Sequence, residues 1–152
     1  MSNVVSIHSG PRWRVMVAHA RSETRHVIRT LVESTDAAVV EVADGEEAIA
    51  RLDAGARFDL LLLELDLPLK DGLSVMQMHR LLLAHEQGSA VAPDVVFVLA
   101  PQVRDNAALT DHLRGLGAAG FIDDAPRADV VELVASILDA RAMRQAGKPA
   151  AA

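Results

Sequence analysis

The sequence has no cysteine, and this absence excludes disulfides, thiol catalysis and thiolate metal sites. It has no apolar run that approaches the roughly 20 residues needed to span a membrane. Its N-terminus lacks the basic start and long apolar segment of a signal peptide. A basic surplus is missing too, since the formal net charge is −6, which argues against a general nucleic-acid binder. We therefore expect a cytoplasmic protein whose partner is neither a membrane nor a nucleic acid.

The residues that are present are typical of one folded domain. The chain has 152 residues, 51% of them hydrophobic and 24% charged, which is enough for a substantial core. Residues 1–12 show no clear period and are expected to form a loose leader. Residues 13–141 are predicted to form the domain, and residues 142–152 a frayed C-terminal tail.

Short apolar runs alternate along the chain with segments that have the spacing of amphipathic helices. The predicted strands cover residues 14–18, 38–43, 59–65, 95–99 and 121–122. The predicted helices begin near Ser22, Asp44, Gly72, Asp105 or Asn106, and Val130, and Ser22 and Asp44 are expected to cap theirs. Five strands alternating with five helices predict a parallel sheet covered on both faces. The common arrangement at this size is the flavodoxin-like doubly wound sandwich, with strand order 2-1-3-4-5.

The central stretch is FDLLLLELDLPLKDG, at residues 58–72. Its apolar run suits a strand that is buried on both faces, as in a parallel sheet. The following Pro, Lys, Asp and Gly are a turn signal that leads into a helix. Glu64 therefore sits where the strand ends, at the carboxyl edge of the sheet. Open α/β sheets place their chemistry at that edge.

Three stretches carry a resemblance to a known family: VVEVADGEEAIARL at 39–52, DLLLLELDLPLKDG at 59–72 and LGAAGFI at 116–122. With the strand and helix order, they make residues 13–140 resemble the receiver domain of two-component response regulators. No DNA-binding or enzymatic output module follows in the sequence. The resemblance therefore implies a single-domain signalling protein that is not an enzyme.

Receiver domains accept a phosphoryl group from a histidine kinase on an Asp after the third strand. An acidic pair after the first strand holds Mg²⁺, while a hydroxyl after the fourth and a Lys after the fifth contact the phosphoryl oxygens. The matching positions in this sequence are Glu64 for the acceptor, His19 and Ala20 for the acidic pair, Ala100 for the hydroxyl and Asp124 for the Lys. Every functional position is changed, while the surrounding framework is retained.

Each change works against phosphoryl transfer. Without the acidic pair, a hard cation has too few oxygen ligands. Asp124 would repel a phosphoryl group, because both carry negative charge. The longer side chain of Glu64 places its carboxylate beyond the in-line position. We predict a degenerate pocket with no bound metal or cofactor, and signalling that does not depend on phosphorylation.

Two alternatives keep a role for phosphate or its charge. Glu64 could mimic a permanently phosphorylated Asp, although Ala100 and Asp124 lack the groups that would bind that charge. Asp66, two residues further on, could serve as a non-standard acceptor on a phosphorylatable receiver. In the family its position supplies a backbone carbonyl to the metal, and its side chain varies.

His19, Glu64 and Asp124 should converge at one end of the sheet. We expect a hydrogen-bonded charge cluster in which His19 pairs with Glu64 or Asp124 and replaces the metal. The alternative is a new metal site with one imidazole and two carboxylates, or a metal-dependent enzyme built on it. No nucleophile or substrate motif in the sequence supports that enzyme.

The remaining expectations concern binding. Phe121 falls at the position of the family's switch aromatic, and Ala100 leaves room for its ring to pack inward. In this family the face built from the fourth helix, fifth strand and fifth helix usually contacts partners. Exposed candidates on that face are Arg104, Asp111, Arg114, Asp139 and Arg141. The expected partner is a protein, either a histidine kinase, another signalling protein or a second copy in a homodimer.

Overall fold

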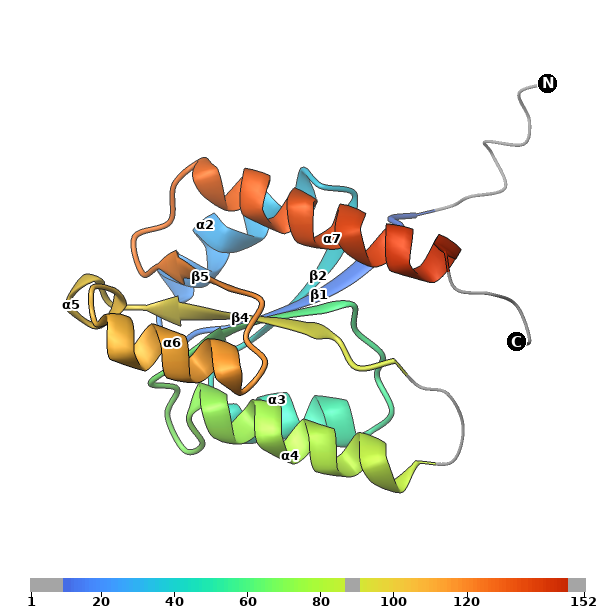
Figure 1. The fold of residues 1–152 in the computed structure, drawn as a ribbon, viewed down its shortest axis with the longest axis horizontal. Coiled ribbons are helices and arrows are strands. Elements are labelled where there is room, and N and C mark those ends of the chain that lie inside the picture. Colours follow the sequence, from blue (N-terminus) through green and yellow to red (C-terminus); the bar gives the residue numbers. More distant parts are fainter. Residues whose placement is uncertain (1–9, 87–90, 148–152) are drawn as a thin grey trace.

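The computed structural model describes residues 10–86 and 91–147, so most of the expected leader and the last five residues lie outside it. Within the described residues the predicted flavodoxin-like sheet is confirmed (Figure 1). Five parallel strands lie in the order β2-β1-β3-β4-β5. Their bounds are Trp13–Ala18 for β1, Ala37–Val42 for β2, Leu60–Glu64 for β3, Asp94–Leu99 for β4 and Gly120–Asp123 for β5.

Helices cover both faces of this sheet. Side chains of α2 and α7 pack on one face, and those of α3, α4 and α6 pack on the other (Figure 1). None of the described helices is long and apolar enough to cross a lipid bilayer. The helix bounds are Ser22–Glu33 for α2, Gly45–Asp53 for α3, Gly72–His85 for α4, Pro101–Arg104 for α5, Ala107–Gly115 for α6 and Asp129–Gly147 for α7.

Strand β3 is the centre of the core. Its four leucines, Leu60 to Leu63, have no exposed surface. Leu60 and Leu62 pack with the α2 and α7 side, whereas Leu61 and Leu63 pack with the α3, α4 and α6 side. A strand buried on both faces requires this alternation. Each fully buried leucine contributes about 1.5–3 kcal/mol, so this strand fixes where its polar end, Glu64, must lie.

Most helix starts follow the sequence. Asp44 and Asn106 cap α3 and α6 as predicted, each accepting a backbone N–H, at 2.7 Å and 3.1 Å. The expected cap at Ser22 is wrong, because Ser22 is already helical and Arg21 precedes it without a side-chain cap. Instead, the backbone N–H of Arg21 donates to His19 and holds the turn.

The short helix α5 was not predicted. Its four residues follow Ala100, and it begins with a proline, which suits the first turn of a helix. A single turn is too short to show a helical period in the sequence. Helix α5 matters because it carries Arg104 toward the end of β5.

The last helix extends further than predicted, and one expected surface residue on it is buried. The prediction of a frayed tail from residue 142 is wrong for residues 142–147, which continue α7. Arg141 is only 4% exposed, and it pairs with Asp59 at 3.3 Å and with Asp94 at 3.4 Å. Arg144 also pairs with Asp94, at 3.1 Å. These ion pairs hold the helix end against the amino edge of the sheet and explain both differences.

His79 makes the stability of the fold depend on pH. It is 7% exposed on α4, and its Nδ1 has no hydrogen-bond partner among the described residues. Burial lowers the pKa of His79 below its usual 6.5, Glu86 opposes this and Arg57 adds to it. Between the two pKa values the unfolded chain binds a proton that the folded chain does not, so stability falls as the pH drops below about 6.5.

We predict that His79→Gln removes part of this loss. In chemical denaturation between pH 7.5 and pH 5, the wild type should lose more free energy of unfolding than the variant. The exposed His112 provides the control, and His112→Gln should keep the wild-type slope. Equal slopes for the wild type and His79→Gln would contradict the assignment.

Candidate functional site at the carboxyl edge of the sheet

The strand register brings four loops to one edge of the sheet. Ala18 lies beside Leu63, and Leu99 lies beside Asp123. The residues that follow these strands, together with Glu64 at the end of β3, therefore meet in one place. This edge contains all five positions that the sequence singled out as the degenerate pocket: His19, Ala20, Glu64, Ala100 and Asp124.

The structure brings His19, Glu64 and Asp124 together, with one nitrogen or oxygen of each within 4.8 Å of the others. His19 is 1% exposed. Its Nε2 lies 2.5 Å from Asp124 Oδ1 and 3.5 Å from Glu64 Oε2. Asp124 is thus the hydrogen-bond partner of His19, and Glu64 is a more distant neighbour.

The two ring nitrogens of His19 have different roles. The backbone N–H of Arg21 donates to Nδ1 at 3.1 Å, so Nδ1 carries a lone pair. The proton of the neutral ring then lies on Nε2, which donates it to Asp124. A proton on Nδ1 would point at the N–H of Arg21. The hydrogen bonds therefore select one tautomer.

This arrangement does not suit a metal ion. A metal bound to Nε2 of His19 would need the proton on Nδ1, where the N–H of Arg21 already donates. Both carboxylates are also engaged, because Ala20 N–H donates to Glu64 Oε1 at 2.9 Å and Arg21 Nη2 donates to Asp124 Oδ2 at 2.6 Å. Mg²⁺ prefers several free oxygen ligands. The residues present do not fit the Mg²⁺ site of receiver domains.

Sequence reasoning missed two arginines that complete the cluster. Arg21 supplies the positive charge beside Asp124. Arg25 donates to the carbonyl oxygens of His19 at 2.8 Å and Ala20 at 3.3 Å, which fixes the loop after β1. One feature of the sequence could have indicated them. The pocket has an acid, Asp124, at the position of the family's lysine, so it needs a cation from a neighbouring loop.

Arg25 is itself held by Glu41 on β2, at 3.2 Å. Burial alone would raise the pKa of Glu41. The hydrogen bond from Arg29, the charge of His26 and the hydrogen bond from Arg25 outweigh burial and hold this pKa below its usual value. Glu41 therefore stays charged and anchors the arginine that shapes the site.

Glycine is required where the loop after β3 turns into α4. A Cβ at Gly72 would lie 2.5 Å from the carbonyl oxygen of Glu64, closer than real contacts allow. The N–H of Gly72 also donates to the carbonyl of Leu65 at 2.9 Å. This close approach places the start of α4 directly behind Glu64.

The remaining space at this edge is small. A cavity of about 30 Å³ is lined by Glu64, Asp66, Ala100 and Asp124, together with Val103 and the ends of β3 and β4. A water molecule needs about 10–15 Å³ by this measure, so the cavity has room for about two. Asp66 is exposed and borders the cavity.

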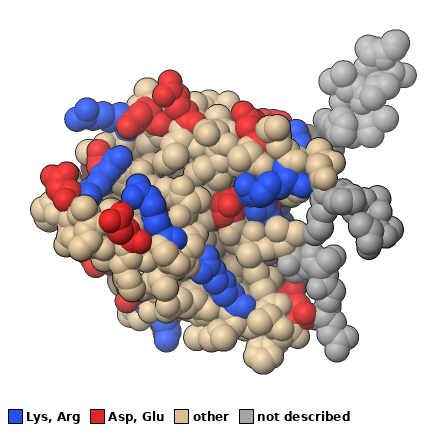
Figure 2. Space-filling model, in the orientation of Figure 1, with Lys and Arg blue, Asp and Glu red and all other residues tan. Residues whose placement is uncertain are grey.

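The predicted binding residues lie on the α6, β5 and α7 side. Phe121 packs inward with 7% exposure, and the guanidinium of Arg114 lies 5.1 Å from its ring. Asp111, Arg114 and Asp139 are exposed, and Arg104 pairs with Asp123 at 2.8 Å. Figure 2 shows cationic and anionic side chains interspersed over one face of the molecule.

We predict that NMR will find the proton of the neutral His19 ring on Nε2, because Nδ1 accepts the backbone N–H of Arg21. Long-range ¹H–¹⁵N correlations distinguish the two nitrogens of each histidine ring. The expected spectrum of the neutral ring shows a protonated Nε2 and a bare Nδ1. A proton on Nδ1 would contradict the hydrogen bond from Arg21 and reopen the possibility of a metal on Nε2.

Comparisons with known proteins agree with this geometry at the level of fold. No protein-family model matches the sequence, and no curated protein matches it. The chain is similar to the receiver domain of AraT, a response regulator from Geobacillus stearothermophilus, with 23% identity and a TM-score of 0.71 over 88% of this chain and 98% of that one. It is also similar to the receiver domain of the Francisella response regulator 1452, with 17% identity and a TM-score of 0.70 over 86% and 99%. A third similar structure is a CheY-like receiver domain from Methanospirillum hungatei, with 16% identity and a TM-score of 0.70 over 87% of this chain and 98% of that one. The chain has the fold of the response regulator receiver domains.

Proposed function

We propose that this chain is a receiver-like protein of two-component signalling that acts by binding a protein partner and does not accept phosphate. In this proposal it is a binding module of the cytoplasm and not an enzyme. Its receiver fold supports a response-regulator-like role. The contacts within its pocket argue against phosphoryl transfer.

The proposal depends on one observation. His19 and Arg21 each hydrogen-bond to one of the two carboxylate oxygens of Asp124. A receiver needs a cation and a free ammonium around its acceptor. Here the carboxylate of Asp124 stands at the ammonium position and already has donors from the chain itself. The cavity beside Glu64 has a volume of about 30 Å³, which is room for about two water molecules.

The same contacts weigh against Glu64 as a mimic of phosphorylated Asp. Its Oε1 accepts the backbone N–H of Ala20, which belongs to the loop after β1. The residues that would respond to phosphate are Ala100 and Asp124, and neither attracts a carboxylate. The charge of Glu64 thus stabilises the loop after β1. It does not favour one conformation of the domain over another.

The proposed binding surface is the α6, β5 and α7 face. Asp111, Arg114 and Asp139 are exposed there, and their mixed charges suit polar pairing with a protein. Proposed partners are a histidine kinase, another signalling protein or a second copy of the chain. Arg141 is not part of this surface, because it is buried against Asp59 and Asp94.

Exposure to acetyl phosphate and Mg²⁺ tests the proposal. The intact mass of the wild type should not change, while a functional receiver domain in the same reaction gains one phosphoryl group. The reason is that no cation and no ammonium stabilise the charge at Glu64.

A gain of one phosphoryl group by this chain would contradict the proposal. Peptide mapping would then separate Glu64 from Asp66, the other acceptor at this edge. If Asp66→Asn abolished the gain, the protein would be a working receiver with a non-standard acceptor.

A further inference from the structure

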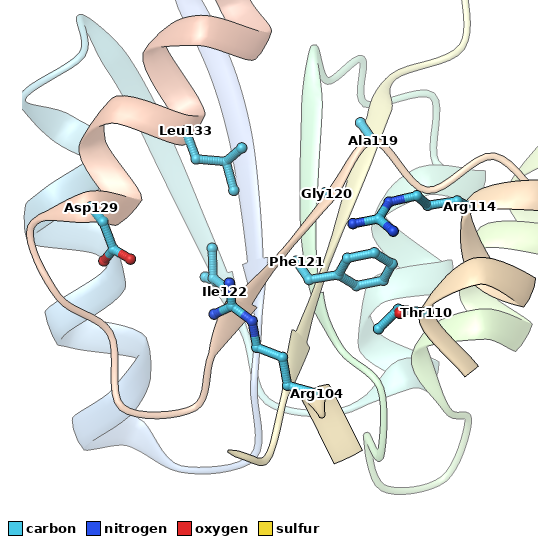
Figure 3. Close-up of a pocket in the computed structure, with 9 residues that line it drawn as sticks. All are labelled: Arg104, Thr110, Arg114, Ala119, Gly120, Phe121, Ile122, Asp129 and Leu133. Carbon is cyan, nitrogen blue, oxygen red and sulfur yellow. The ribbon is translucent and has the colours of Figure 1, made fainter. Parts of the chain in front are cut away.

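A groove follows β5 between α6 and α7 (Figure 3). Its volume is about 400 Å³, and small-molecule sites in proteins have volumes of roughly 300–1,000 Å³. Apolar side chains form one part of its lining, and charged and hydroxyl side chains form another. A groove of this size and mixed lining suits a small polar ligand that has one apolar part.

Two arginines reach the groove from different elements. Arg104 is the last residue of α5, and Arg114 lies on α6 (Figure 3). Arg104 forms an ion pair with Asp123 at 2.8 Å, and Arg114 forms one with Asp111 at 3.5 Å, and all four side chains are accessible to solvent. Since a guanidinium has five N–H donors, most donors of both arginines remain available to a ligand.

A buried hydroxyl also borders the groove. Thr110 is only 8% exposed, and its Oγ1 donates over long distances, 3.2 Å to the carbonyl of Ala107 and 3.4 Å to that of Asn106. Hydroxyl hydrogen bonds are ordinarily about 2.5–3.0 Å long. The hydroxyl of Thr110 is therefore weakly bonded, and it can turn toward a ligand oxygen at little cost.

The rest of the lining suits a ring and its polar substituents. Phe121 and Leu133 contribute apolar surface. A Cβ at Gly120 would come within 3.3 Å of Leu133, so the absence of a side chain there leaves space in the groove. Asp129 lies on the α7 side (Figure 3), and its carboxylate can accept hydrogen bonds from hydroxyl or amino groups.

We propose that this groove binds a nucleoside monophosphate, whose phosphate is held by Arg104 and Arg114. A phosphate group carries up to two negative charges and three acceptor oxygens, so it can pair with two guanidinium groups, whereas a single guanidinium satisfies a carboxylate. The planar base packs on the apolar surface beside Phe121. The sugar hydroxyls donate to Asp129.

This inference goes beyond the proposed function. The groove opens on the α6, β5 and α7 face, so a bound phosphate would change the charge that a protein partner meets there. Binding of the nucleotide requires neither a partner nor phosphoryl transfer. A titration therefore succeeds or fails independently of the intact-mass experiment.

NMR titration of the wild type with AMP, GMP, CMP and UMP tests the proposal. At least one of them should cause saturable shifts in the amide signals of Thr110 and of residues 119–122. The matching nucleoside and inorganic phosphate should each bind about tenfold or more weakly, because each lacks one half of the contacts.

Substitutions test the two arginines. Arg104→Gln and Arg114→Gln should each weaken nucleotide binding about tenfold or more, because each removes charge-assisted hydrogen bonds to the phosphate. Arg51→Gln on α3 is the control, since Arg51 is another solvent-accessible arginine in a weak ion pair, 3.9 Å from Glu47. Its affinity should equal that of the wild type. All three variants should melt close to the wild type, because none of these side chains is buried.

Three results would overturn the proposal. None of the four nucleotides could cause saturable shifts in the groove. Inorganic phosphate could bind as tightly as the nucleotide, which would indicate an adventitious ion only. Finally, Arg51→Gln could weaken binding as much as the two groove variants do, which would place the nucleotide outside the groove.

Discussion

The hydrogen bond from His19 to Asp124 joins the loop after β1 to the loop after β5. In the strand order, β3 and β4 lie between these two strands, so the bond spans the carboxyl ends of both. Arg21 reinforces it from the same loop as His19. The buried imidazole cannot lose its partner without leaving a polar group unsatisfied, which costs about 1–3 kcal/mol. This hydrogen bond therefore holds the two loops together across the site.

Three acids at the site, Glu64, Asp123 and Asp124, have a donor from the chain itself. Glu64 accepts from Ala20, Asp123 pairs with Arg104, and Asp124 pairs with His19 and Arg21. These three carboxylates therefore have partners within the chain and need no bound cation to satisfy them. The close packing at Gly72 fixes the loop geometry through backbone contacts and does not depend on phosphate chemistry.

The sequence was sufficient to predict the features that depend on the spacing of apolar residues and on the order of the strands. The apolar runs predict the strands, and their parallel order brings His19, Glu64 and Asp124 to one edge. The sequence was not sufficient for features that depend on ion pairs between residues far apart in the chain. The burial of Arg141 depends on two aspartates at the amino ends of β3 and β4, and the role of Arg21 depends on a residue about a hundred positions away. One-turn helix α5 and the positive φ of Leu69 leave no periodic signal.

Thermal unfolding in the presence and absence of Mg²⁺ is the most direct measurement of whether the carboxylates at this edge bind a cation. A site with a dissociation constant near 1 mM would add about 1.4 kcal/mol at 10 mM Mg²⁺, a shift of roughly 3–6 °C. We predict that MgCl₂ leaves the melting temperature where NaCl of equal ionic strength leaves it. A saturable rise with Mg²⁺ that is lost in Asp124→Asn would contradict it.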